Sequence, residues 1–229
     1  MGTLKLSVDR IEILKRRDLV GKDEPYLWVF GICVPTPAVT PVEAFVITTD
    51  GRPGNLGDGM RKGDARAVPA AVGRIETDTS PIAGRILVAG LAVMAWERDF
   101  TDPGTIQIAY RETAKIIDQF IIGFIPAMLA EGAIRDPNDA EMAKLRADVE
   151  GMLRDRFKAS LSMNLPWSLN LDDFIGLGQR VVKIEDAREP FHQDLTFDVE
   201  ARGTHWRLTG AIDHQPEIEG RHLRLGRTR

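Results

Sequence analysis

The chain has 229 residues, of which 43% are hydrophobic and 28% charged, a composition typical of a soluble globular protein with a buried core. Its net charge of −4, from 34 acidic and 30 basic residues, argues against a general nucleic-acid binder, which needs a basic face. The single cysteine, Cys33, excludes an internal disulfide and a cysteine metal cluster, and its apolar neighbours predict a buried, inert thiol.

The first hundred residues have the patterns of β-strands. Apolar and polar residues alternate from residue 4 to residue 14, with a period close to that of a half-buried strand. Residues 26–34, 44–49 and 85–96 are rich in β-branched and aromatic side chains and are bounded by Gly, Pro or Asp. Residues 51–73 contain six glycines and several charges, which predicts a long irregular loop.

The middle of the chain changes to a helical period. Two apolar stripes recur at helical spacing, the first from Ile106 to Met128 and the second from Met142 to Phe157. Between them stands Asp136-Pro137-Asn138, an acceptor and a proline of the kind that begin a helix. We therefore expect an antiparallel helical hairpin. Its apolar stretch at residues 119–130 is too short to cross a bilayer, which needs about 20 residues.

Strand patterns return at residues 181–184, 195–200 and 206–212, and Gly203 marks a hairpin turn between the last two. The strands on either side of the helices are too few to close a core alone. We therefore predict a mainly β protein, an antiparallel β-sandwich of residues 1–100 and 168–229 with residues 101–167 inserted as a helical hairpin.

Two groups of loop residues resemble the metal-site loops of calcium-binding C2 domains. The family's first loop carries an aspartate, a glycine three residues later and then Asp-Pro-Tyr; the matching residues here are Asp18, Gly21, Glu24, Pro25 and Tyr26. The family's third loop follows a strand that ends in an aromatic residue, opens with Asp-x-Asp and closes with Asp, two apolar residues and Gly. Residues 93–99 are similar to its opening and residues 172–176 to its closing.

This resemblance implies a calcium site whose ligands would be Asp18, Glu24, Glu97, Asp99 and Asp173. Calcium takes six to eight oxygen ligands at about 2.3–2.6 Å, which carboxylates on several loops can supply. Without a cation the same carboxylates repel one another and raise one another's pKa values.

The match departs from the family in three ways. Positions 24 and 97 hold glutamate where the family generally has aspartate, and Asp99 and Asp173 are 74 residues apart where the family has a handful. The predicted helical hairpin fits into that interval. Lys22 and Arg98 lie in the same loops and offer positive charge in place of a metal. For the family's second loop the candidates are Asp50 and Asp58.

The metal loops of C2 domains are the end that meets lipid headgroups. A hairpin growing from that end would bring Phe120, Phe124 and Trp167 to a membrane or a partner. The alternative is that the apolar helix face packs on the second helix and the sandwich, and that Trp167 fills a gap in the core.

These patterns lead us to expect a non-enzymatic module, cytoplasmic or peripheral to a membrane, that attaches to phospholipid or a protein partner with calcium. One alternative is a metal-free C2-like structural or interaction domain. Another is a membrane-active, toxin-like protein acting through the hairpin. A metal-assisted hydrolase using Glu97, Asp99 and Asp173 lacks an evident general base and cleft, and the chain has no phosphate loop, nucleophile elbow or zinc-helix motif.

Overall fold

The computed structural model describes residues 2–16, 25–36, 45–48, 54–57, 59–79, 86–97, 103–130, 135–161, 174–201 and 203–216.

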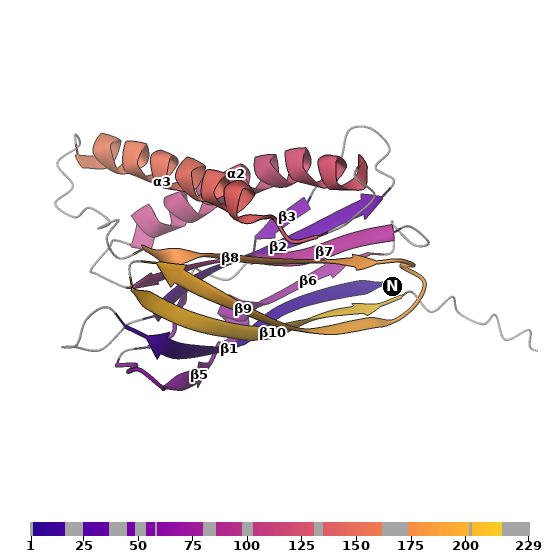
Figure 1. Ribbon diagram of the computed structural model, residues 1–229, viewed down its shortest axis with the longest axis horizontal. Coiled ribbons are helices and arrows are strands. Elements are labelled where there is room, and N and C mark those ends of the chain that lie inside the picture. Colours follow the sequence, from indigo (N-terminus) through magenta and orange to yellow (C-terminus); the bar gives the residue numbers. More distant parts are fainter. Residues whose placement is uncertain are drawn as a thin grey trace, which may run out of the picture.

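Within these ranges, ten strands form two antiparallel sheets (Figure 1). The first, here called the open sheet, has the order β5 (Ala65–Ala67), β1 (Thr3–Lys15), β10 (Thr204–Gln215), β9 (Phe191–Ala201), with β6 (Arg74–Asp78) also paired to β1. The second, here called the covered sheet, has the order β3 (Phe45–Thr48), β2 (Pro25–Thr36), β7 (Ile86–Glu97), β8 (Phe174–Ile184), with β4 (Gly54–Asn55) also paired to β2.

The two sheets pack face to face on a common hydrophobic core. Both sheets contribute fully buried residues to it, including Ile13, Leu27, Leu91, Val199 and Trp206. The inward side of β1 follows the alternation seen in the sequence, with one change of phase between Val8 and Ile11. A β-bulge lies at that point, where the pairing with β10 shifts between Val8 and Arg10.

Helices α2 (Pro103–Ala130) and α3 (Asp139–Leu161) cover the outer face of the covered sheet, so the molecule has three layers (Figure 1). Between helices and sheet lies a second buried core, to which both β2 and β7 contribute large side chains, among them Trp28, Phe30, Met94 and Trp96. Both helices follow β7 and precede β8 in the chain, and these two strands are neighbours in the covered sheet.

The prediction of a mainly β chain with antiparallel sheets is confirmed, and both helical stripes form helices. The turn at Gly203, whose φ is 89°, joins β9 to β10 as expected. The prediction of one long irregular loop at residues 51–73 is wrong, because this stretch contains β4, β5 and the short helix α1 (Ala70–Gly73). Strand β6 was not predicted, and β8 begins seven residues earlier than expected, at Phe174.

Cys33 lies on β2 and is 5% exposed. Burial raises the pKa of its thiol to about 12, because the low-dielectric core disfavours the thiolate. The thiol is therefore buried and unreactive, as its apolar neighbours indicate.

Gly210 stands opposite the bulge in β1, and a Cβ placed there would lie 1.9 Å from the carbonyl oxygen of Ser7. We expect Gly210→Ala to lower the free energy of unfolding by about 1–3 kcal/mol, because the backbone of β1 must move. The matched control is Gly151→Ala on α3, where a Cβ meets nothing within 4 Å and should stabilise the helix by about 0.5–1 kcal/mol. Urea denaturation measures both, and equal effects would contradict the close approach.

Candidate functional site

The strand register brings several chain segments to one end of the covered sheet. Pro25, the first residue of β2, pairs with Glu97, the last residue of β7. Trp96 in turn pairs with Phe174, the first residue of β8. Residues 17–24, 98–102 and 162–173 are therefore joined to the sheets at this end, which we call the Pro25–Glu97 end.

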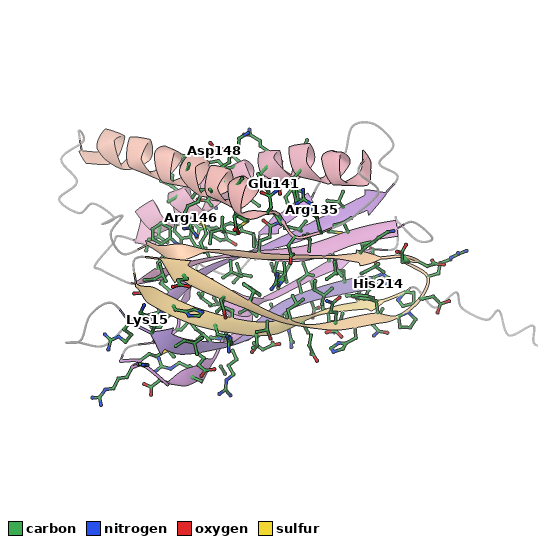
Figure 2. All side chains as sticks on the ribbon, viewed as in Figure 1. Lys15, Arg135, Glu141, Arg146, Asp148 and His214 are labelled. Atoms are coloured by element: carbon green, nitrogen blue, oxygen red, sulfur yellow. The ribbon has the colours of Figure 1, made fainter. Side chains whose placement is uncertain are left out.

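The end of β1 lies at the same place. The Leu56 N–H donates to the Pro25 carbonyl at 2.8 Å, and Arg66 donates to the Leu56 carbonyl at 2.6 Å. Arg66 itself lies opposite Ile11 in the pairing of β5 with β1. Lys15, at the end of β1, and the buried His214 lie at opposite ends of the molecule (Figure 2). The end of β1 and the start of β2, the strands before and after residues 17–24, thus both lie at the Pro25–Glu97 end.

The predicted metal ligands fall largely outside the described residues. Of the five, Glu97 has a described backbone, at the end of β7. The others, together with further candidates that the sequence indicates in these loops, lie in the parts of the chain that the structure does not describe: Asp18, Lys22, Glu24, Asp50, Asp58, Arg98, Asp99, Trp167 and Asp173. Among the described residues, no three His, Cys, Asp or Glu side chains form a metal-binding group.

An aromatic cluster supports this end of the sheet beneath α2. The rings of Trp28 and Trp96 lie 4.8 Å apart, and Tyr110 of α2 meets Trp28 edge-on at 5.9 Å and stacks on Phe30 at 4.9 Å. The Tyr110 hydroxyl donates to the carbonyl of Val29 at 3.0 Å in a buried position. Helix α2 is thereby fixed to β2 within a few residues of Pro25, which gives the site a rigid support.

The two phenylalanines predicted to contact a membrane or partner lie between the helices. Phe124 is 6% exposed, whereas Phe120 is half-buried, and their rings stack at 5.2 Å. Ile117 and Ile121 on the same helix are fully buried against the covered sheet. Phe124 therefore belongs to the core of the structure as it stands, and only Phe120 reaches the surface. Among the described residues, neither helix is long and apolar enough to cross a membrane.

The turn between the helices is pinned to the covered sheet by Asp136. Its carboxylate accepts the Val181 N–H of β8 at 2.8 Å and forms a short ion pair with Arg180. The sequence pattern indicates Asp136 as a helix cap, which is wrong, because the cap is Asn138. Its side chain accepts the Glu141 N–H at 3.0 Å while Glu141 accepts the Asn138 N–H at 2.7 Å, a reciprocal capping box.

Arg135 completes this turn. It donates two hydrogen bonds to Glu141, at 2.7 and 3.0 Å, and its guanidinium lies 5.5 Å from the centre of the Phe124 ring. The hydrogen bond from Arg135 lowers the pKa of Glu141, and the Asn138 backbone N–H adds to the effect. Paired charge and aromatic contact thus hold the closed end of the hairpin over the sheet.

Histidines of the open sheet are occupied by structural contacts. The buried His214 has the Glu189 carbonyl 3.3 Å from Nδ1 and the Thr79 hydroxyl 3.0 Å from Nε2. Because a carbonyl only accepts, Nδ1 donates to the Glu189 carbonyl. His192 on β9 lies beside Asp213 at 2.6 Å and Asp194 at 3.3 Å. Thr79 and His214 are 2% and 0% exposed, so their contact is enclosed within the structure.

No protein-family model matches the chain, and no curated protein matches it. A function for the chain is therefore inferred from its own residues.

Replacing Asp136 should loosen the turn of the hairpin. Asp136→Ala leaves the Val181 N–H without its acceptor, and we expect a loss of about 1–3 kcal/mol in the free energy of unfolding. Hydrogen exchange should show faster exchange at the Val181 amide than in the unaltered chain. The control Asp139→Ala, an exposed acid in the first turn of α3, should change stability by about 0.3–1 kcal/mol and leave Val181 protected.

The ion pair of His192 predicts a pH-dependent contribution to stability. The hydrogen bond to Asp213, with a smaller contribution from Asp194, raises the pKa of His192 above its ordinary value of 6.5. Its stabilising effect is therefore complete below pH 6.5 and is lost as the pH rises through the raised pKa. The stability of His192→Gln should fall below that of the unaltered chain at pH 5.5 and equal it at pH 9. An NMR titration of His192 with a midpoint at or below 6.5 would contradict this.

Proposed function

We propose that this chain is a non-enzymatic binding module whose Pro25–Glu97 end binds calcium and thereby attaches to an anionic surface. The observation that carries the proposal is the register in which Pro25 pairs with Glu97 and Trp96 with Phe174. The segments that contain Asp18, Glu24, Asp99 and Asp173 are all anchored at that end. Glu97 itself closes β7 there.

Electrostatics supports a cation at this end. Four acids on three segments, together with Glu97, lie within a few residues of strand ends at this end of the sheets, and carboxylates that come close together repel one another. Calcium accepts carboxylates in a flexible geometry and tolerates ligands contributed by several loops. A bound calcium ion with open coordination positions attracts phosphate or carboxylate oxygens, so phospholipid headgroups and acidic protein surfaces are the partners to test.

The contacts of the hairpin favour this function over a toxin-like role. Ile117 and Ile121 of α2 are fully buried against the covered sheet, and Tyr110 and Asp136 bond to β2 and β8. Transfer of the helices to a membrane would expose the outer core of the covered sheet. In the metal-free alternative, Lys22 or Arg98 neutralises the acids. Measurements of stability with and without calcium distinguish it from the calcium proposal.

Calcium should stabilise the chain against heat. At 100 times its dissociation constant a ligand adds about 2.7 kcal/mol, which corresponds to a rise in Tm of about 5–10 °C for a chain of this size. The combined variant Asp18→Asn with Asp99→Asn should abolish this rise. Differential scanning fluorimetry in millimolar calcium and in chelator, followed by sedimentation with vesicles containing phosphatidylserine, measures binding and attachment.

A matched control uses two glutamates near opposite ends of the covered sheet. Glu97→Gln alters the proposed site, whereas Glu185→Gln alters an exposed residue in the turn after β8, at the far end of that sheet. Only Glu97→Gln should reduce the effect of calcium. An unchanged Tm in calcium, together with stabilisation by Asp99→Asn, would overturn the proposal in favour of the metal-free domain.

A further inference from the structure

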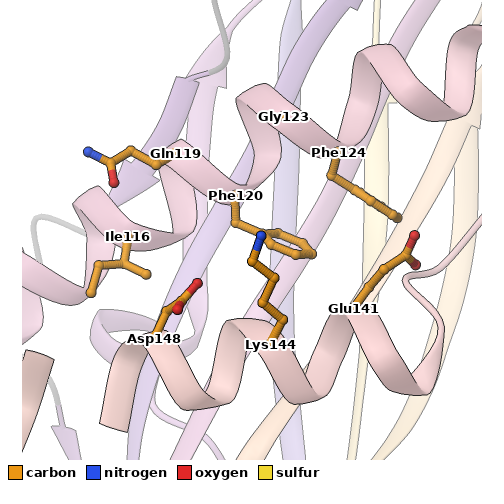
Figure 3. Close-up of a pocket in the computed structure, with 8 residues that line it drawn as sticks. All are labelled: Ile116, Gln119, Phe120, Gly123, Phe124, Glu141, Lys144 and Asp148. Atoms are coloured by element: carbon orange, nitrogen blue, oxygen red, sulfur yellow. The ribbon is translucent and has the colours of Figure 1, made fainter. Parts of the chain in front are cut away.

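A groove of about 480 Å³ runs between α2 and α3 on the face turned away from the sheets (Figure 3). Its α2 side is apolar apart from Gln119, and its α3 side is charged. The residues that line it are Ile116, Gln119, Phe120, Gly123 and Phe124 from α2, and Glu141, Lys144 and Asp148 from α3.

The charged residues of the groove differ in whether another described residue forms an ion pair with them. Glu141 is paired with Arg135 inside the hairpin. Lys144 and Asp148 are both exposed, stand one helical turn apart and reach from α3 toward α2 (Figure 3). Within the described part of the chain, neither takes part in an ion pair. Within a helix, a lysine four residues before an acid pairs with it less favourably than an acid four residues before a lysine.

Among the residues that the structure describes, nothing requires glycine at two positions within the helices. Gly123 and Gly151 are exposed, and a Cβ at either position would meet nothing within 4 Å. Glycine destabilises a helix interior relative to alanine. Gly123 lines the groove, and Gly151 follows Lys144 at the seven-residue spacing that keeps it on the same side of α3. A surface that packs closely against this face would account for both.

We propose that this groove is the interface of a symmetric dimer, formed with a second copy of the chain. A two-fold axis that passes between Lys144 and Asp148 places Lys144 of each copy opposite Asp148 of the other. The interface then contains two equivalent pairs of opposite charges, so the charged α3 side of the groove is self-complementary. On α2, the same axis near Phe120 brings the half-buried Phe120 of one copy against Phe120 of the other. The glycines allow the antiparallel helices to approach.

Charge complementarity selects the second copy over an unrelated partner. Lys144 and Asp148 are one helical turn apart, so two copies related by a two-fold axis bring opposite charges together. No further charged residue is needed. The proposed interface also lies on the helical layer and uses none of the carboxylates assigned to calcium. Dimerisation should therefore be the same in calcium and in chelator, which separates this proposal from the proposed function.

Sedimentation velocity on the full chain over a hundredfold range of concentration tests the dimer. The single reversals Lys144→Glu and Asp148→Lys place like charges across the axis and should each weaken association by about tenfold or more. The double variant Lys144→Glu with Asp148→Lys restores opposite charges in a symmetric dimer and should recover association. An exposed control on α2 outside the groove, Arg111→Glu, should leave it unchanged.

Variants of the two glycines give a second measurement, in which thermal stability rises while dimerisation weakens. Gly123→Ala and Gly151→Ala should each raise Tm by about 2–4 °C, because alanine favours the helix, and should weaken dimerisation. A chain that is monomeric throughout the concentration range overturns the proposal. A dimer that is insensitive to both single reversals, or that the double reversal fails to restore, overturns it as well, since the partner face would then lie elsewhere or would not be symmetric.

Discussion

The structure depends on the pairing of β2 with β7, which extends over twelve residue pairs from Pro25–Glu97 to Thr36–Ile86. Both strands are buried on both faces: Leu27 and Leu91 point into the core between the sheets, while Trp28 and Met94 point to the helices. Without the helical layer, the outward side chains would form an exposed apolar surface far larger than a soluble monomer carries. The hairpin is therefore required by the sheet that it covers.

This constraint is visible in the sequence, which is why much of the fold could be predicted. The strands of the open sheet alternate, as β1 does, because one of their faces meets water, whereas residues 26–34 and 86–96 are almost continuously apolar, as strands buried on both sides are. The helical stripes follow the same logic, and Ile106, Ile117 and Phe124 are buried as their spacing indicates. Short elements such as β6 carry too few apolar residues to be recognised, and only their pairing with β1 makes them strands.

The candidate site could be predicted only in part, because its geometry depends on contacts between residues far apart in the chain. The acids are evident in the sequence, but only the pairing of Pro25 with Glu97 and of Trp96 with Phe174 brings together the strand ends from which their segments continue. Asp136 shows the same limit: a local motif indicates a helix cap, whereas its actual partner, Val181, is 45 residues away. The expectation that these acids lie together comes from the order of the C2-like motifs along the chain. Composition and periodicity do not predict it.

The groove between α2 and α3 and the Pro25–Glu97 end, the two surfaces proposed for binding, do not share the contacts that attach the hairpin to the covered sheet. Its inner stripe is fixed by the covered sheet, by the bond of Tyr110 to Val29 and by Asp136, none of which involves the outer groove. Residues such as Lys144 and Gly123 contribute little to that attachment, since one is an exposed charge and the other has open space above it. The proposed association at the groove and the proposed cation binding at the Pro25–Glu97 end therefore depend on different residues. Variants at one surface should leave the other surface folded.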